Sequence, residues 1–307
     1  MMQELLVGST GFVGGNLLAR HRFDAVCHSS DIAAQFGTQP GLCVYAGVPA
    51  AMFLANADPA ADLAVMRAAR ENLQKINPRQ LVLISSIAVY ADSRGRDEDS
   101  EMALESLPAY GKNRLQLERW VREDFPAALI VRLPALYGVG QKKNFLYDLH
   151  TITPAMLKPE KYAALSADSA LVKTGYTRAE NGFYKLNGTA DPAALKAFFA
   201  QNTFNALAFT DSRSRYQFYN LGRLWGDIGA ALAQKLTLLN LTTPPVSAAR
   251  VYQAVTGKAD WHNELDPPPF DYDLRSRHAS LLGGQGGYLC SEAQELADIR
   301  TFMKNWQ

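Results

Sequence analysis

The stretch Leu5–Leu18, with the sequence LLVGSTGFVGGNLL, constrains the fold of this chain more than any other part of it. Its apolar run Leu5–Val7 is long enough only for a buried strand, and the run stops at Gly8. The apolar residues that follow recur at the spacing of a helix: Phe12, Val13, Leu17 and Leu18. We therefore expect a strand, a tight turn, and a helix whose first N–H groups point into the turn.

The glycines of this stretch have the spacing of a dinucleotide-binding turn. Gly8 permits the turn, Gly11 lets the backbone approach phosphates, and Gly14 lets the helix pack on the strand. A helix start carries partial positive charge and open donors, which suit a pyrophosphate. An ordinary strand–turn–helix of small residues is the alternative, but the strand before and the helix after the glycines favour the ligand site. The predicted cofactor contacts here are Gly8, Ser9, Thr10, Gly11, Phe12, Val13 and Gly14.

Composition and charge narrow the class of protein. The 307 residues, 48% hydrophobic and 20% charged, have an ordinary globular balance, and the formal net charge of +1 gives no basis for binding nucleic acid or a membrane. No apolar run approaches the ~20 residues that span a bilayer, and we expect no signal peptide. The odd set Cys27, Cys43 and Cys290 favours free thiols in the cytoplasm, and the scattered histidines favour no metal site.

Apolar strands alternate with helices along the first half of the chain. The expected strands are 23–27, 42–46, 81–86 and 128–133, and the expected helices include 61–76, with Asp62 as its cap, and 110–123. Because these strands show no alternation of polar and apolar residues, each is buried on both faces. The pattern predicts an α/β fold of the Rossmann type, a doubly wound parallel sheet with helices on both faces.

The pattern loosens after residue 150. We expect a Rossmann domain over residues 1–150 and a smaller substrate lobe over 151–307, with about 216–257 returning to the core. The insertion 151–212 has no clean period, and we expect a hairpin across 171–186 and a helix over 192–201 within it. Whether the insertion shapes the pocket or mediates assembly stays open.

Two polar segments of the sequence lie where the nicotinamide end of a bound dinucleotide would be. Ser85 and Ser86 end one strand, and Tyr110 to Arg114 opens the following helix. Ligands of an open parallel sheet lie beyond the carboxyl ends of its strands, and Tyr110 and Arg114, four apart, share a helix face. A phenol with a pKa near ~10 is a poor proton carrier at neutral pH, and a cation on the same face lowers that pKa. Ser86 would hold the substrate oxygen while Tyr110 exchanges its proton.

Together these pieces resemble the extended short-chain dehydrogenase/reductase family, the NAD(P)-dependent sugar-nucleotide epimerases and dehydratases. The resemblance covers about residues 1–140 and rests on Gly8-x-x-Gly11-x-x-Gly14, Ser85-Ser-Ile-Ala-Val-Tyr90, Tyr110-Gly-Lys-Asn-Arg114 and Arg132-Leu-Pro-Ala-Leu-Tyr-Gly138. It implies that Ser86 is the active-site hydroxyl, that Tyr110 is the catalytic tyrosine, and that Leu133 and Pro134 contact the nicotinamide side. It also implies a homodimer formed through helices 61–76 and 110–123.

The chain departs from the family pattern at the cation beside the tyrosine. The family's Tyr-x-x-x-Lys becomes Tyr110-x-x-x-Arg114, which keeps the charge but offers a planar fork in place of an ammonium. Retained activity is the favoured interpretation, because Ser86 and Tyr110 are both present. The alternative is a catalytically attenuated dinucleotide-binding sensor or scaffold.

The residues that follow the neighbouring strands bear on the choice of cofactor. The family's ribose-binding acid falls near Ser29, and its absence removes repulsion of a 2′-phosphate. NADP is therefore favoured over NAD, with Ser29 and Ser30 as donors, and plain loop polarity is the alternative. The other predicted cofactor contacts are Ala46, Gly47, Ser85, Tyr110 and Arg114.

The predicted reaction is hydride transfer at a carbon bearing a hydroxyl or carbonyl, in a reductase or in the redox step of an epimerase. Ile87-Ala88 stands where a dehydratase of the family has an Asp/Glu pair, which disfavours dehydration. Ala135 stands where sugar-nucleotide enzymes often have asparagine, which weakens the case for a nucleotide sugar. Arg213 and Arg215 fall where the family often places a phosphate-contacting arginine, although plain surface cations are the alternative.

Overall fold

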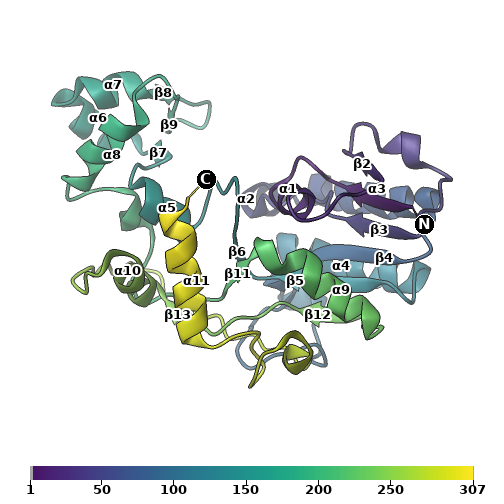
Figure 1. Cartoon of the computed structure of the whole chain (residues 1–307). Helices are drawn as coiled ribbons and strands as arrows, with labels where there is room; N and C mark the ends of the chain where they lie inside the picture. Colours follow the sequence, from purple (N-terminus) through teal and green to yellow (C-terminus); the bar gives the residue numbers. More distant parts are fainter. Residues whose placement is uncertain (1–2, 307) are drawn as a thin grey trace. The chain divides into compact units, whose positions relative to one another are not determined.

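The computed structural model describes residues 3–306, which form two compact units (Figure 1). Unit 1 comprises residues 3–141, 215–246 and 271–306, and unit 2 comprises residues 142–214 and 247–270. These limits differ from the expected 1–150 and 151–307, because segments 142–150 and 247–257 belong to unit 2 and segment 271–306 belongs to unit 1.

A six-stranded parallel sheet forms the centre of unit 1, in the order β12-β5-β4-β3-β1-β2. Its strands are β1 (Glu4–Val7), β2 (Ala25–Cys27), β3 (Leu42–Tyr45), β4 (Leu81–Ser86), β5 (Leu129–Leu133) and β12 (Leu238–Asn240). Every residue of β5 is buried, as a strand covered on both faces requires. The chain order reverses at β1, which pairs with both β2 and β3. The structure confirms the predicted Rossmann-type doubly wound fold.

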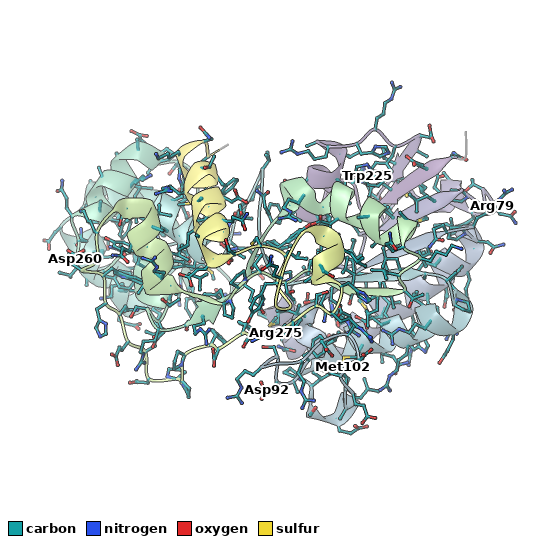
Figure 2. The ribbon with its side chains drawn as sticks, turned by 60° about the horizontal axis from the view of Figure 1, so that its bottom comes forward. Arg79, Asp92, Met102, Trp225, Asp260 and Arg275 are labelled. Atoms are coloured by element: carbon teal, nitrogen blue, oxygen red, sulfur yellow. The ribbon has the colours of Figure 1, made fainter. Side chains whose placement is uncertain are left out.

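Helices cover both faces of this sheet. α1 (Phe12–Leu18) and α9 (Leu224–Ala233) pack on one face, where Leu17 and Ile228 are fully buried. α3 (Pro59–Ile76) and α4 (Ala109–Asp124) pack on the other face. Trp225 of α9, labelled in Figure 2, stacks on the ring of His21 with ring centroids 3.8 Å apart, which ties α9 to the segment after α1.

The remaining elements of unit 1 are short, apart from the closing helix. They are α2 (Met52–Ala57), β6 (Ala135–Tyr137), β10 (Arg215–Tyr216), β11 (Phe218–Asn220) and α11 (Glu292–Lys304), with β13 (Val246–Ser247) at the boundary. Single 3₁₀ turns lie at η1 (Ile32–Gln35), η2 (Ile87–Val89), η3 (Leu104–Ser106), η5 (Leu221–Arg223) and η6 (Ala279–Leu282).

A buried glutamate ties α11 to the rest of unit 1. Glu295 Oε1 accepts hydrogen bonds from the Phe218 N–H at 2.9 Å and from the Thr243 hydroxyl at 3.0 Å. Its Oε2 is buried without a hydrogen-bond partner in the described chain. Burial raises the pKa of Glu295 to about 8, so the carboxyl favours its neutral form at neutral pH.

Unit 2 has its own apolar core. Its elements are α5 (Phe145–Thr151), β7 (Met156–Leu157), α6 (Pro159–Ala167), α7 (Ala170–Gly175), β8 (Tyr176–Arg178), β9 (Tyr184–Leu186), α8 (Pro192–Ala200), η4 (Ala206–Phe209) and α10 (Ala248–Thr256). The three strands pair antiparallel in the order β7-β9-β8. One cluster fills the space beneath them: Leu157, Val172, Tyr176, Ala190, Leu195 and Phe199.

The expectation of a hairpin across 171–186 is only partly correct. Residues 170–175 form α7, because the Ser169 hydroxyl caps the Val172 N–H at 3.3 Å and the Val172 side chain is fully buried. The hairpin is confined to β8 and β9. The expected helix over 192–201 is α8. Within residues 3–306, no helix has the length and apolar character needed to cross a membrane.

Candidate active site

The carboxyl ends of the central strands bring most of the predicted site residues to one edge of the sheet. In register, Val7 of β1 lies opposite Tyr45 of β3, and Ser86 of β4 lies opposite Leu133 of β5. Gly8, Ala46 and Pro134 follow these strands directly. In an open parallel sheet this edge, beside the reversal at β1, is where ligands bind.

The turn between β1 and α1 has the geometry that the glycine spacing predicts. Gly8 has a φ of +88°, a conformation that side chains disfavour. A Cβ atom at Gly14 would lie 2.2 Å from the Gly8 carbonyl oxygen, so only glycine allows this approach of helix and turn. No side chain caps α1 at Gly11, which leaves its first N–H groups open to an anion.

The end of β2 presents hydroxyl and imidazole groups. The Ser9 hydroxyl lies 3.0 Å from His28 Nδ1, which links the glycine turn to this strand end. The Asp31 carboxylate accepts a hydrogen bond from the main-chain N–H of His28 at 2.6 Å. Ser29 and Ser30 are exposed, and their hydroxyls make no hydrogen bond within residues 3–306. They are therefore available to a ligand.

The two serines that end β4 have different partners. Ser85 donates its hydroxyl proton to the Glu118 carboxylate at 2.6 Å. Ser86 accepts from the Ala88 N–H at 3.2 Å and keeps its own proton free of any acceptor in the described chain. Successive side chains of a strand point to opposite faces, which separates the two hydroxyls. Ser86 is therefore the serine whose hydroxyl proton is left unused within the described chain.

Glu118 belongs to a buried charged network that sequence reasoning missed. Its carboxylate forms an ion pair with Arg132 of β5 at 2.5 Å, and both side chains are fully buried. Arg132 also donates to the Tyr90 hydroxyl at 2.6 Å, and Asn240 donates to that hydroxyl at 3.0 Å. Burial raises the pKa of Tyr90. The sequence did contain a signal for this network: Glu118 lies on the apolar face of its helix, and Arg132 lies inside an apolar strand.

Tyr110 lies in the first turn of α4, close to the segment that follows Ser86. A Cβ atom at Gly111 would lie 2.0 Å from the Ala88 carbonyl oxygen, so the helix start packs tightly on η2. Asn56 of α2 accepts from the Tyr110 N–H at 2.9 Å and fixes the turn. The Tyr110 hydroxyl makes no hydrogen bond within residues 3–306, although the residue is 7% exposed.

Arg114 is held by protein groups rather than left free for a ribose. Its Nη1 pairs with the Asp62 carboxylate at 2.5 Å, and its Nη2 donates to the Pro49 carbonyl at 2.6 Å. The guanidinium carbon lies 3.8 Å from the centre of the Tyr110 ring. The expectation that Asp62 caps the helix is wrong, because Asp58 caps α3 by accepting from the Ala61 N–H at 3.0 Å.

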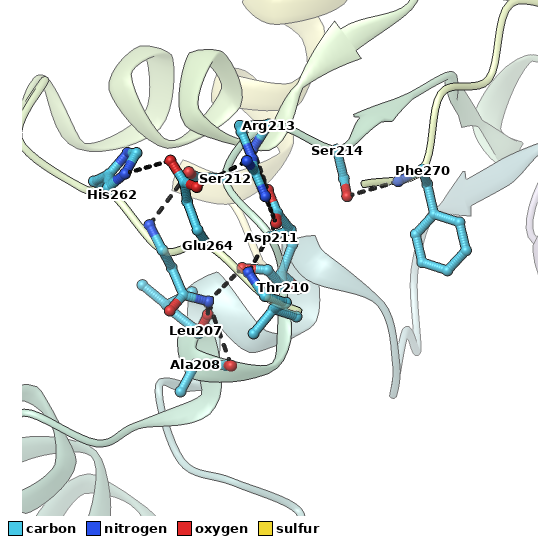
Figure 3. Close-up of polar contacts among 12 residues, drawn as sticks. Leu207, Ala208, Thr210, Asp211, Ser212, Arg213, Ser214, His262, Glu264 and Phe270 are labelled. Carbon is cyan, nitrogen blue, oxygen red and sulfur yellow. Dashed lines mark hydrogen bonds and ion pairs between the residues drawn. The ribbon is translucent and has the colours of Figure 1, made fainter. Parts of the chain in front are cut away.

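The two arginines considered for phosphate contact each have acidic partners. In unit 2, Arg213 pairs with Asp211 at 2.7 Å and with Glu264 at 2.8 Å (Figure 3). The Arg213 side chain also lowers the pKa of Asp211 by hydrogen bonding to it. In unit 1, Arg215 pairs with Asp271 at 3.2 Å. The part of the chain that the structure describes holds no cluster of three His, Cys, Asp or Glu placed to bind a metal.

Comparison with known proteins points to one family. The model of a family described as the RmlD substrate binding domain matches residues 2–156. None of the curated protein sequences matches this chain.

Solved structures resemble the chain over its whole length. A dTDP-4-dehydrorhamnose reductase from Yersinia enterocolitica has a TM-score of 0.64 at 12% identity and covers 100% of both chains. RMD from Pseudomonas aeruginosa, complexed with NADPH, has a TM-score of 0.61 at 16% identity and covers 99% of both. A UDP-glucose 4-epimerase from Thermotoga maritima, solved with UDP-glucose, has a TM-score of 0.58 at 10% identity and covers 99% of this chain and 98% of its own.

Proposed function

This chain belongs to the RmlD substrate-binding-domain family of extended short-chain dehydrogenases/reductases, and from that premise we propose that it is an NAD(P)-dependent oxidoreductase. It transfers a hydride at a carbon that bears a carbonyl or a hydroxyl. The family resemblance also leaves room for the redox step of an epimerase. Reduction is favoured, because two of the similar solved structures, the reductase and the NADPH-bound RMD, point that way.

One observation carries this proposal: the chain places two hydroxyl groups with unused protons, on Ser86 and Tyr110, at and after the carboxyl end of β4. The Ser86 proton and the Tyr110 proton have no acceptor within residues 3–306. Polar groups in folded proteins usually have hydrogen-bond partners. Two hydroxyl donors without a protein acceptor, near a glycine-rich turn, are therefore suited to bind an oxygen atom of a ligand. Ser86 orients that oxygen by hydrogen bonding, and Tyr110 delivers its proton to it or takes one from it.

The cofactor would lie across the carboxyl edge of the sheet. The open N–H groups at the start of α1 suit its pyrophosphate, and the backbone after β5 at Leu133 and Pro134 suits the nicotinamide side. The nicotinamide, when bound, supplies or accepts the hydride. Free hydroxyls on Ser29 and Ser30 favour a 2′-phosphate and therefore NADP over NAD.

The substrate would be a small molecule, and a nucleotide sugar is the leading class. The similar epimerase was solved with UDP-glucose. We assign unit 2 the role of substrate lobe. Since Arg213 and Arg215 already pair with carboxylates, a phosphate there would have to compete with Asp211, Glu264 and Asp271.

Consumption of NADPH tests the function directly. Purified protein is titrated with NADPH and NADH, then given a panel of carbonyl compounds and nucleotide sugars. We expect turnover with at least one member, and a loss in kcat of about 10²–10⁴-fold in Tyr110→Phe. Tyr288→Phe, which removes a tyrosine hydroxyl bonded to Asp273, is the matched control.

Two outcomes would count against the enzyme. Tight coenzyme binding without turnover on the whole panel would favour the sensor or scaffold, and no binding of either coenzyme would remove both functions.

Further proposals concern assembly and location. We propose a homodimer formed through α3 and α4, which sedimentation would test. Free Cys27, Cys43 and Cys290 support a cytoplasmic location.

A further inference from the structure

We propose that Asp62 is a positioning residue that acts on Tyr110 through Arg114. Its carboxylate holds the guanidinium against the face of the tyrosine ring and offsets the positive charge there. This inference rests on the proposed function, because it takes Tyr110 as the proton carrier. It assigns to an acid of α3 a part in setting the proton affinity of a phenol on α4.

The contact is direct and shielded from water. Arg114 Nη1 and Asp62 Oδ2 lie 2.5 Å apart, and the two side chains are only 4% and 9% exposed. The guanidinium carbon sits 3.8 Å from the centre of the Tyr110 ring, well within the range of a cation–π interaction. A desolvated ion pair of this kind interacts more strongly than one on the surface.

Further hydrogen bonds fix both members of the pair. Arg114 Nη2 donates to the Pro49 carbonyl at 2.6 Å, while Asn113 Nδ2 donates to Asp62 Oδ2 at 2.8 Å. The planar fork of arginine can make two such contacts while it stacks on a ring, whereas a lysine ammonium offers neither the plane nor the fork. The arginine at position 114 therefore suits a carboxylate at position 62.

The other charged groups near Tyr110 are few, and each is either exposed or paired with another protein group. Among the elements packed on the start of α4, the ranges of α2, β4 and η2 contain no charged residue, and the charged residues on either side of Asp62 along α3, Asp58 at its N-cap and Arg67, are exposed. Glu105 of η3 and Lys112 of α4 are exposed. Further along α4, the Glu118 carboxylate is held by Arg132 and Ser85. Asp62 and Arg114 are thus the buried charges that act on this phenol.

The sign of the effect follows from the charges. Asp62→Asn keeps a hydrogen-bond acceptor of the same shape but removes the negative charge, so the arginine stabilises the phenolate more strongly. Tyr110 then titrates at lower pH. Arg114→Gln leaves the carboxylate without its cation, so Tyr110 titrates at higher pH. We expect each shift to be about one pH unit.

A spectroscopic titration of the full chain tests this without cofactor or substrate. Tyrosinate absorbance is followed against pH for each variant and for the same variant carrying Tyr110→Phe, and the difference reports Tyr110. We expect the midpoint to fall in Asp62→Asn, to rise in Arg114→Gln, and to return near the original value in the double variant. The pH profile of kcat should move in the same directions.

Asp58→Asn is the matched control, because Asp58 caps the same helix without touching Arg114. It should leave the midpoint unchanged. A lower Tm in Asp62→Asn with an unmoved midpoint would make Asp62 merely structural and overturn the inference. If Asp62→Asn does not fold, Asp62→Ser, which also removes the negative charge, takes its place with the same expected fall in the midpoint. A chain that shows no turnover would defeat the proposed function yet leave this titration valid.

Discussion

The two units of the molecule bury different kinds of contact. In unit 1, charged side chains lie inside the core, where Glu118 and Arg132 form a fully buried ion pair between α4 and β5. In unit 2, the cluster beneath the three-stranded sheet consists of apolar and aromatic side chains such as Val172 and Phe199. Buried charge costs desolvation energy and imposes strict geometry, whereas apolar packing is more tolerant. Unit 1 uses its charged contacts where the candidate site must be held in place.

The largest expected effect follows from breaking the ion pair of unit 1. Glu118→Ala leaves the Arg132 guanidinium buried and uncompensated, and it also removes the acceptor of the Ser85 hydroxyl. We expect the free energy of unfolding to fall by about 4 kcal/mol, measured by urea denaturation. Glu123→Ala on the same helix, whose side chain is 64% exposed, should cost little. A loss below about 1 kcal/mol for Glu118→Ala would show that the network contributes no net stability.

The corresponding change in unit 2 removes apolar volume. Phe199 is fully buried, so Phe199→Ala should lower the free energy of unfolding by about 3 kcal/mol. Phe209, which is 53% exposed, supplies the control Phe209→Ala. NADPH affinity should stay within about twofold in both variants, because distant sites are usually independent. A large loss of NADPH affinity in Phe199→Ala would mean that the two units are coupled.

A smaller effect should appear as a dependence of stability on pH. The pKa of Glu295 is raised by burial from 4.5 to about 8, so the neutral carboxyl is favoured in the folded chain. The stabilisation from the neutral Glu295 carboxyl is complete below the ordinary pKa of 4.5, and it is lost as the pH rises through the raised pKa of about 8. Between about pH 5 and about pH 7, the free energy of unfolding should fall by about 2 kcal/mol on this account.

Urea denaturation at several pH values checks this dependence. Glu295→Gln should flatten the slope over that window, and Glu292→Gln, at an exposed position of the same helix, should leave it in place. An unchanged slope in Glu295→Gln would assign the pH dependence to other groups.

Much of unit 1 could be predicted from local pattern alone. The strand expected over 81–86 is β4, and the helix expected over 110–123 is α4, extended by one residue at each end. Long apolar runs and regular spacing carry this information because each element buries a continuous face. In unit 2 the strands have only two or three residues, which is too few to show a period, so the hairpin expected over 171–186 wrongly includes most of α7.

The residues expected at the carboxyl edge of the sheet were found from motifs, and their roles remain predictions. What the sequence could not supply was the choice of partners. Asp62 was expected to serve its own helix, yet its carboxylate pairs with Arg114 on another. Glu118 and Arg132 likewise meet only once the sheet and α4 are assembled. Pairings of this kind depend on contacts distant in sequence, which no local period records.

Ser85 and Ser86 are adjacent and chemically identical, yet the fold makes them non-interchangeable. The Ser85 hydroxyl is bound to an acid inside the protein, and the Ser86 hydroxyl proton has no protein acceptor in the described chain. Neither can take over if its neighbour is lost, because the alternation of the strand sends them in opposite directions. An engineer who wished to relocate the substrate-binding hydroxyl by a single position would therefore have to rebuild the interior as well as the surface.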